Sequence, residues 1–361
     1  MAHCFGDFRR FRFNFPQRIA AAFLALFLAQ GLWLILRQPL SAHEQQYIHC
    51  GRVSWTGATA DQVCNVLGDG RLDKLLAGFS FTNNATLAQL LLRLPFLAAG
   101  CLLGGGLWWV TRRLFGDLGG YTALALYCFS PAILTASTMP NPEILSALGL
   151  YGGVYTAIGV AHAMQGPRRK WRPRIVLLTL SFAIAASAHL VALALTLLLA
   201  LGFMLWVAEG RRKPVAPVLA AATCGALVLR WVAAGFSWEC FRPSPFSFTI
   251  SREPFQQFFF LRSMLGLSLA MVVALALYAR FRRSRYFGNT TPLLCALICL
   301  VLTLWINGAA GAPWLWAVPF LLTFLAGVFA DAYESARPRL ALAVGAGLVL
   351  AQLAVCAASI F

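Results

Sequence analysis

Side chains that can move a proton gather in one short polar stretch, SAHEQQYIHCGR at 41–52. The stretch follows directly on nineteen mostly apolar residues at 18–36. His43 and Glu44 are neighbours in it, and a carboxylate or an imidazole can act as a general base toward a hydroxyl group. Tyr47 and Arg52 add hydrogen-bond donors. The residue types indicate a site for proton transfer beside a membrane segment.

A second acid occurs in the triplet Asn141-Pro142-Glu143. Local structure can account for it, because asparagine caps helices, proline is common at the first helical position, and an acid is favoured in the first turn. That role does not exclude a place in a site, so Glu143 is a candidate catalytic residue and Asn141 a candidate binding residue.

Three arginines lie where apolar segments begin or end. An arginine inside a membrane segment usually faces a cavity or a partner, which makes Arg93 a candidate ligand for a phosphate group. The alternatives are a side chain that extends to the lipid headgroups, or an ion pair with Glu143 or Glu44. Arg230 and Arg262 flank a later polar segment, where they either contact phosphate or anchor the chain at the interface.

The composition determines the class of protein. Hydrophobic residues make up 60% of the 361 residues and charged residues 11%, whereas about a quarter of the residues in a soluble domain are charged. The mean hydropathy is +0.73. Since each membrane crossing needs about 20 apolar residues as helix, the sequence predicts an all-α polytopic membrane protein with about eleven transmembrane helices, at 18–36, 88–111, 119–137, 144–163, 174–189, 190–208, 215–236, 262–280, 292–306, 313–330 and 339–360.

The net charge of +17 is distributed in short basic clusters at every second membrane boundary. With the N-terminus in the cytoplasm, all the clusters face inward and, together with Arg18, hold 20 of the 29 lysines and arginines. This positive-inside pattern predicts a cytoplasmic N-terminus and accounts for the charge without nucleic acid. The clusters lie at 9–12, 112–113, 168–174, 211–213, 280–285 and 337–339.

This topology leaves two long outer loops, at 37–87 and 237–261, while every inner connection is short. We therefore expect one transmembrane domain at 1–361, without a soluble C-terminal domain, and a site on the outer side. Within the first loop, leucines at helical spacing predict a short amphipathic helix at 71–79. Cys50 and Cys64 lie in the same loop, either bridged or as two unlinked thiols.

Other candidate residues fit structural roles. The apolar block at 175–207 is too long for one crossing, which predicts a break with His189 at the outer turn. Trp314 and Trp316 fit an aromatic belt at the membrane surface better than a sugar-binding platform. The cysteine and histidine spacings match no metal site, and no metal or cofactor is predicted.

Three stretches, in order, resemble the GT-C superfamily of lipid-sugar-dependent glycosyltransferases, which includes protein O-mannosyltransferases and aminoarabinose transferases. HEQQYIHCGR at 43–52 lies just after the first helix, where those enzymes typically carry an Asp-Glu pair, a tyrosine and an arginine. The segment 311–328 resembles a late helix that the family often opens with Pro-Arg-Tyr. The stretch 91–145 is the most specific, because it combines Arg93-x-Pro95, RRLFG at 112–116, Ser130-Pro131 and Pro142-Glu143.

The resemblance implies transfer of a sugar from a polyprenyl-phosphate donor to an acceptor on the extracytoplasmic side of a membrane, in bacteria the inner membrane. It assigns the base to the first outer loop, either Glu44 itself or His43 oriented by Glu44. The partners it implies are the polyprenyl-phosphate-linked sugar and membrane lipid.

Two departures from the family pattern keep a second interpretation open. His43 stands where an aspartate is expected, and Pro313-Trp314 stands where the family has Arg-Tyr. The alternative is a catalytically inactive GT-C-derived subunit with a structural or interaction role in a membrane complex. A transporter would require a duplicated pair of Gly/Pro-interrupted helices, which the sequence does not show.

Overall fold

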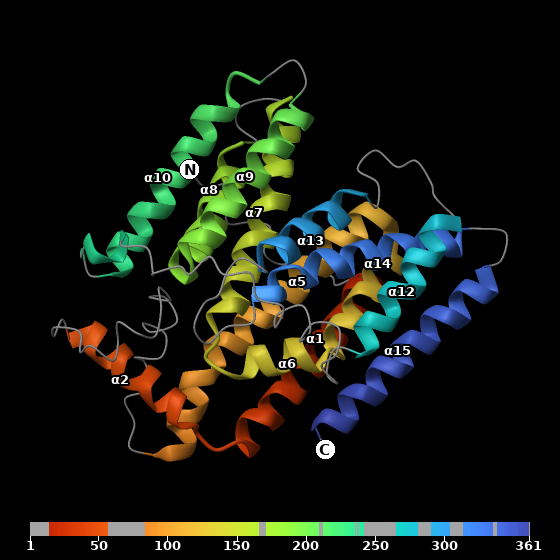
Figure 1. The fold of residues 1–361 in the computed structure, drawn as a ribbon, viewed down its shortest axis with the longest axis horizontal. Helices are drawn as coiled ribbons and strands as arrows, with labels where there is room; N and C mark the ends of the chain where they lie inside the picture. Colours follow the sequence, from red (N-terminus) through yellow and green to blue (C-terminus); the bar gives the residue numbers. More distant parts are fainter. Residues whose placement is uncertain are drawn as a thin grey trace.

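The computed structural model describes residues 14–56, 84–165, 171–208, 212–234, 236, 238–241, 265–280, 290–303, 313–334 and 338–360. Helices account for nearly all of these residues, without a strand among them (Figure 1). The elements are α1 (Phe15–Arg37), α2 (Ala42–Thr56), α5 (Ala85–Cys128), α6 (Pro131–Thr138), α7 (Pro142–Met164), α8 (Arg172–Ala188), α9 (Leu190–Val207), α10 (Val215–Ala233), η3 (Trp238–Phe241), α12 (Leu265–Arg280), α13 (Thr290–Thr303), η5 (Pro313–Trp316), α14 (Val318–Tyr333) and α15 (Pro338–Ile360).

The chain is an integral membrane protein. Within the described residues, seven helical segments are long and apolar enough to cross a bilayer, and α12 and α13 are shorter apolar helices. Each predicted span from 144 onward coincides with one helix, from α7 to α15. These helices are apolar nearly all round, as expected for helices that are buried in the protein or face lipid. The segment that contains α14 is buried throughout, whereas only 17% of an 18-residue stretch of α15 is buried in the protein.

The long helix α5 turns back on itself. Gly116 has φ 81° and ψ −176°, a conformation that costs glycine little and other residues much. A straight helix would separate residues 27 apart by about 40 Å, yet the Tyr127 hydroxyl donates to the carbonyl of Gly100 at 2.5 Å. The two parts of α5 therefore run side by side in opposite directions. With α6, they supply the two spans predicted at 88–111 and 119–137.

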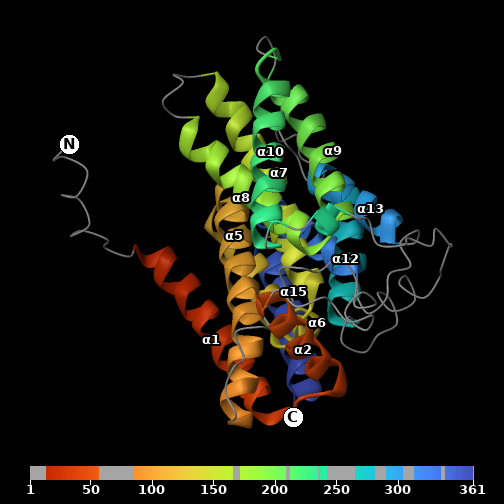
Figure 2. The same cartoon turned by 90° about the vertical axis from the view of Figure 1, so that its left-hand side faces the viewer.

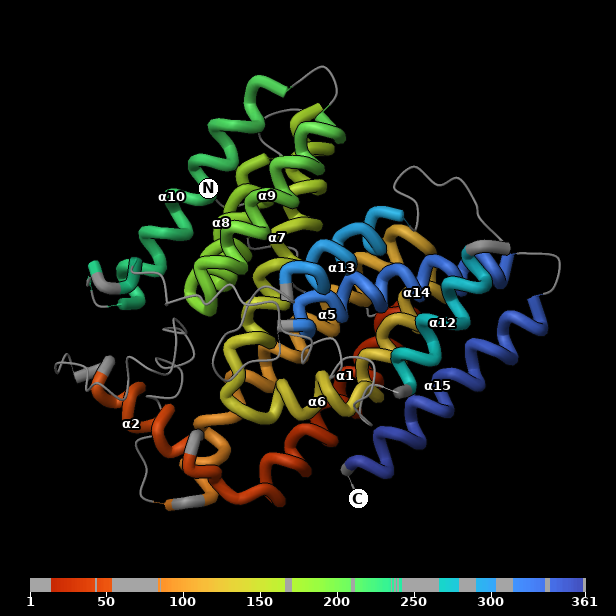
Figure 3. Tube along the Cα trace, viewed as in Figure 1, coloured from red at the N-terminus to blue at the C-terminus, as the bar shows by residue number. Residues whose placement is uncertain are grey.

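The helices form two packed groups that share α7 (Figures 1 and 3). One core lies between α1, α5, α6, α7 and the C-terminal helices, with α14 at its centre. The other lies between the far half of α7 and α8, α9 and α10. Figure 2 shows α1 beside α5, and Figure 1 shows α2 at the left-hand side, next to the start of α5. Among the described residues, α2 contributes Tyr47 and Ile48 to one small apolar cluster with Leu92 of α5, so polar contacts also help to fix its position.

Candidate functional site

The first polar cluster joins α2 to α5 through Glu44 and Arg93. Arg93 Nε donates to Glu44 Oε1 at 2.6 Å, and Arg93 Nη2 donates to Oε2 at 2.8 Å. Arg93 is 1% exposed and Glu44 3%. This is a bidentate, buried ion pair, the strong form of an arginine–carboxylate contact. Of the pairings left open by the sequence, the structure contains the one between Arg93 and Glu44.

The remaining donors of Arg93 cap the end of α1. Nη1 donates to the carbonyls of Ile35 at 3.2 Å and Gln38 at 2.7 Å, and Nη2 donates to that of Pro39 at 3.1 Å. Gln89 also donates to the first two of these carbonyls. A guanidinium has five N–H donors, and Arg93 makes five hydrogen bonds. Its cation also stabilises the negative end of the α1 dipole.

Glu44 is likewise part of a helix start. Its Oε2 accepts from the Ser41 backbone N–H at 2.8 Å, and the Glu44 N–H donates to Ser41 Oγ at 3.3 Å, which is a capping box at the beginning of α2. Burial by itself raises the pKa of Glu44, but the hydrogen bonds from Arg93 and Ser41 and the charge of Arg93 lower it overall. A carboxylate with a lowered pKa is ionised at neutral pH and is a weak base.

The other candidates of the first stretch lie along α2. Tyr47 is 2% exposed and packs with Leu92 of α5, so it belongs to the attachment of the helix. Arg52 is exposed. His43 lies in the first turn of α2, but its side chain is outside the described residues, as is the amphipathic helix predicted at 71–79. Cys50 is disulfide-bonded, and every other described cysteine is free, so its partner lies in an undescribed segment.

The second polar cluster surrounds Glu143, which is 4% exposed. Trp316 Nε1 donates to Glu143 Oε2 at 2.5 Å. His189 Nε2 lies 3.4 Å from Glu143 Oε1, and the rings of His189 and Trp316 have their centroids 6.0 Å apart. Three segments far apart in sequence, the starts of α7 and α9 and the turn η5, therefore contribute one side chain each to a carboxylate site.

Local structure fixes each member of this cluster. Asn141 Oδ1 accepts from the Glu143 N–H at 2.9 Å, which caps α7 and leaves the carboxylate in the favourable first turn. His189 has extended backbone angles between α8 and α9, and its N–H donates to the carbonyl of Ala185 at 2.9 Å. The break predicted at His189 is confirmed. Trp316, which the sequence assigned to a surface belt, is buried at 2% exposure.

Arg230 is not in either cluster. Arg230 is 1% exposed in the last turn of α10, and its Nε and Nη2 donate to the carbonyl of Cys240 in η3 at 2.9 and 2.6 Å. This contact fixes the start of the second predicted loop to α10. Arg262 and most of that loop lie outside the described residues.

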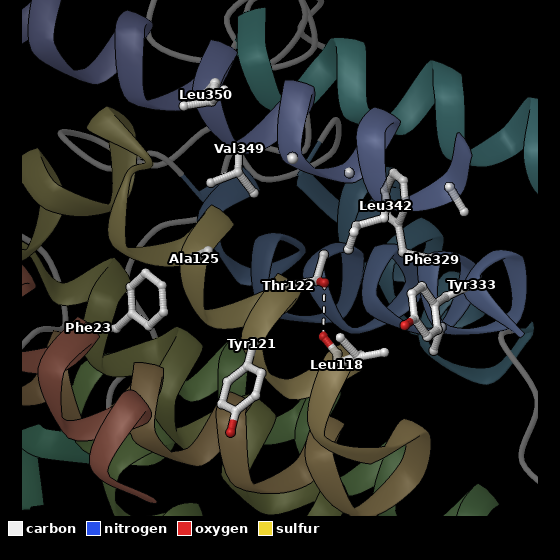
Figure 4. A pocket seen from close by; sticks show the side chains of 14 residues that line it. Phe23, Leu118, Tyr121, Thr122, Ala125, Phe329, Tyr333, Leu342, Val349 and Leu350 are labelled. Carbon is white, nitrogen blue, oxygen red and sulfur yellow. Dashed lines mark hydrogen bonds between the residues drawn. The ribbon is translucent and has the colours of Figure 1, made fainter. Parts of the chain in front are cut away.

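An apolar cleft of about 400 Å³ lies between α1, α5, α14 and α15. Figure 4 shows Val349 and Leu342 of α15 on one side of the cleft and Thr122 of α5 on the other, with Phe23 toward one end and Tyr333 toward the other. Thr122 Oγ1 donates to the Leu118 carbonyl at 2.9 Å. None of the lining side chains is a carboxylate, an imidazole or a cation, so the cleft differs in character from the two polar clusters.

The structure thus brings Glu44 together with Arg93, and Glu143 together with two residues that the sequence did not assign to a site. His189 and Trp316 are 46 and 173 residues from Glu143 along the chain, and no local pattern links them. The sequence nevertheless marked both as unusual: His189 is a histidine inside an apolar block, and Trp316 is a tryptophan at the start of a predicted span. Among the described residues, no three His, Cys, Asp or Glu side chains are arranged to hold a metal ion.

Comparison with known proteins identifies neighbours by structure alone. No family model and no curated protein matches the sequence. ArnT of Cupriavidus metallidurans bound to undecaprenyl phosphate matches with a TM-score of 0.60 and 18% identity, over 92% of this chain and 63% of that one. The apo state of that protein matches with a TM-score of 0.56 and 17% identity, over 95% and 74%. The oligosaccharyltransferase of Archaeoglobus fulgidus, in complex with zinc and sulfate, matches with a TM-score of 0.57 and 12% identity, over 94% and 53%.

These neighbours are GT-C glycosyltransferases. The chain spans just under two thirds of the length of ArnT in its undecaprenyl phosphate complex. At identities this low, the likeness defines the architecture and not the activity. The protein is an integral membrane protein with a divergent GT-C-like fold.

Proposed function

We propose that the chain is a GT-C-type glycosyltransferase that moves a sugar from a polyprenyl-phosphate donor to an acceptor hydroxyl on the extracytoplasmic side, in the bacterial inner membrane. The observation that carries the proposal is the buried carboxylate of Glu143, with Trp316 Nε1 at 2.5 Å and His189 Nε2 at 3.4 Å. Buried acids with designated partners are typical of sites where a proton moves.

The chemistry is a displacement at the anomeric carbon of the donor sugar. The acceptor oxygen forms a bond to this carbon, the bond from the carbon to the phosphate oxygen breaks, and the phosphate keeps the electron pair. Glu143 takes the proton of the acceptor hydroxyl, and Trp316 orients its carboxylate by occupying Oε2. Polyprenyl phosphate as the carrier is supported by the fold shared with ArnT, whose structure contains undecaprenyl phosphate.

The roles of the other candidates are divided accordingly. Arg93 and Glu44 hold α2 against α5 and the end of α1, so we place them in the support of the site. The donor phosphate then requires other cations, for which Arg52, exposed on α2, and Arg262 remain candidates. His43 remains a candidate second base.

The test uses a strain that lacks the gene, whose membranes retain the unused donor and acceptor. Purified protein is added to these membranes, and release of polyprenyl phosphate is measured by mass spectrometry. We expect Glu143→Gln to slow release by about 100-fold or more, as for loss of a general base. Asp331→Asn is the matched control, because Asp331 is also a buried acid, 3% exposed, but lies near the other end of α14 from Trp316. Normal release with folded Glu143→Gln protein would refute the proposal.

One observation favours the alternative, a non-catalytic subunit of a membrane complex. All five N–H donors of Arg93 are bound within the chain, so a pair that the family resemblance assigned to the site is closed to a substrate. Under this alternative, expression of the Glu143→Gln protein in the deletion strain fully restores the wild-type phenotype. Under the proposed function, the Glu143→Gln protein reaches the membrane but does not restore that phenotype.

A further inference from the structure

His189 lies between the buried Glu143 and the surface of the protein. The side chain of His189 is 22% exposed, while that of Glu143 is 5% exposed. His189 Nε2 faces Glu143 Oε1 at 3.4 Å, and the other carboxylate oxygen is occupied by Trp316 Nε1. A proton taken up by Glu143 thus has the imidazole of His189 beside it, and part of that side chain is exposed at the surface.

A buried base must lose its proton before the next turnover. With the acceptor bound at Glu143, a proton on this carboxylate has no direct path to bulk water, because the side chain is 5% exposed and Trp316 occupies its other oxygen. An imidazole accepts a proton at one nitrogen and can release another to solvent near neutral pH. The backbone of His189 is held by two hydrogen bonds, from its N–H to Ala185 and from the Leu193 N–H to its carbonyl, so the ring starts from a fixed position.

We propose that His189 is the proton relay of this site: it receives the acceptor proton from Glu143 and passes it to water on the outer side. The relay rests on the proposed function, since it deepens the role of Glu143. In balanced form, the proton moves from the acceptor oxygen to Glu143 Oε1, then to His189 Nε2, and an imidazolium proton leaves to water. No electrons are exchanged with any other group.

Few other ionisable groups lie near this pair. The described residues of α9 and η5 contain no acid, base or phenol apart from the members of the cluster. The nearest group on α7 is Tyr151, about two turns from Glu143, and its hydroxyl is hydrogen-bonded to Thr323 Oγ1 at 2.9 Å. Tyr155 lies one turn beyond Tyr151 on α7. The remaining described groups on α7, α8 and α14 lie at the far ends of these helices: His162 on α7, Arg172 and Arg174 on α8, and Asp331 and Tyr333 on α14.

The kinetic test compares His189→Gln with His162→Gln in the release assay across pH 5 to 8, approximately the range over which histidine titrates. His189 must be neutral to accept a proton, so the wild-type rate rises with pH over this range. We expect His189→Gln to be about 10-fold slower at neutral pH and to lose this dependence. His162 is exposed in the last turn of α7, the helix that carries Glu143. His162→Gln should therefore keep the wild-type profile.

Rescue distinguishes proton transfer from support of the fold. In His189→Ala, added imidazole restores the rate, and substituted imidazoles of similar size restore it in proportion to their basicity. A role in packing alone predicts rescue that does not depend on basicity, and this result would overturn the relay.

A measurement without turnover separates the two proposals. In protein labelled with ¹⁵N-histidine, nuclear magnetic resonance follows the titration of His189, identified by its absence in His189→Gln. Replacement of Glu143 by Gln removes the neighbouring negative charge, so the midpoint moves to lower pH. An unchanged midpoint refutes the relay while leaving Glu143 as the base. Normal turnover in Glu143→Gln refutes the proposed function itself.

Discussion

Arg93 on α5 donates a hydrogen bond to each carboxylate oxygen of Glu44 on α2, at 2.6 and 2.8 Å. The same guanidinium bonds three carbonyls at the end of α1. One side chain of α5 therefore fixes the end of α1, the following turn and the start of α2. Together with the packing of Tyr47 against Leu92, this arrangement positions the polar stretch at 41–52.

Replacement of Arg93 by methionine should detach α2. The change leaves the Glu44 carboxylate buried without its cation, and breaking a buried pair in this way costs about 3–5 kcal/mol. We expect a lower unfolding temperature in detergent and faster hydrogen–deuterium exchange in α2 and at the end of α1.

A double-mutant cycle isolates the ion pair from the other bonds of Arg93. The variant with both Arg93→Met and Glu44→Gln has no buried charge left, so we expect it to be more stable than Arg93→Met alone by at least about 1 kcal/mol. Simple additivity of the two single changes would show that the pair does not hold α2.

Attachment of α2 should weaken in acid. The pKa of Glu44 is lowered from its ordinary value of 4.5, so its ionised form stabilises the folded state. That stabilisation is complete above pH 4.5 and is lost as the pH falls through the lower folded-state pKa. Hydrogen exchange of α2 measured from pH 6 downward should accelerate only in this acid range, after correction for intrinsic exchange. In Glu44→Gln the attachment is weaker than in the wild type at pH 6, and the acid step is absent. A step that persists in the variant would assign it to another group.

The sequence predicted the membrane helices well because the bilayer imposes a length and an apolar composition on each crossing. The apolar block at 175–207 is too long for a single membrane crossing, and the structure divides it into α8 and α9 at His189. The return of α5 at Gly116 also matches two predicted spans, because the non-helical backbone of this glycine separates two helical parts.

The site was less predictable because its contacts join distant segments. Arg93 and Glu44 were both recognised from their types, but only the folded chain shows that they satisfy each other. Trp316 was misplaced for a physical reason: tryptophan is favoured at membrane surfaces, and sequence alone does not show that a buried acid lies opposite its N–H.

The disulfide at Cys50 gives a test of both connectivity and topology. Its partner lies outside the described residues, and we predict Cys64, since both cysteines fall in the first outer loop. In Cys64→Ser, Cys50 should react with a membrane-impermeant maleimide added to cells whose outer permeability barrier is opened. Cys4→Ser should leave Cys50 unreactive, because Cys4 is expected on the cytoplasmic side. Labelling of Cys50 in the Cys4 variant but not in the Cys64 variant would reverse the assignment.

Gly149 is the point where α7 and α8 approach most closely beside the Glu143 cluster. A Cβ at Gly149 would lie 2.4 Å from the backbone nitrogen of Ala185 and 2.8 Å from its Cα, so Gly149→Ala must push the two helices apart. Overpacking of this kind costs about 1–3 kcal/mol. Gly159→Ala on the same helix meets nothing within 4 Å and should leave the unfolding temperature unchanged or raise it.

The same substitution links packing to the proposed reaction. The Ala185 carbonyl accepts the His189 N–H at 2.9 Å, so displacement of α8 at Ala185 carries His189 away from the Glu143 carboxylate. Gly149→Ala should therefore slow polyprenyl phosphate release even at a temperature where the variant is fully folded, whereas Gly159→Ala should not. The rate lost by Gly149→Ala should also be small in a His189→Gln background, because the relay is already absent there. Equal losses in both backgrounds would mean that Gly149 acts on the site by a route that does not pass through His189.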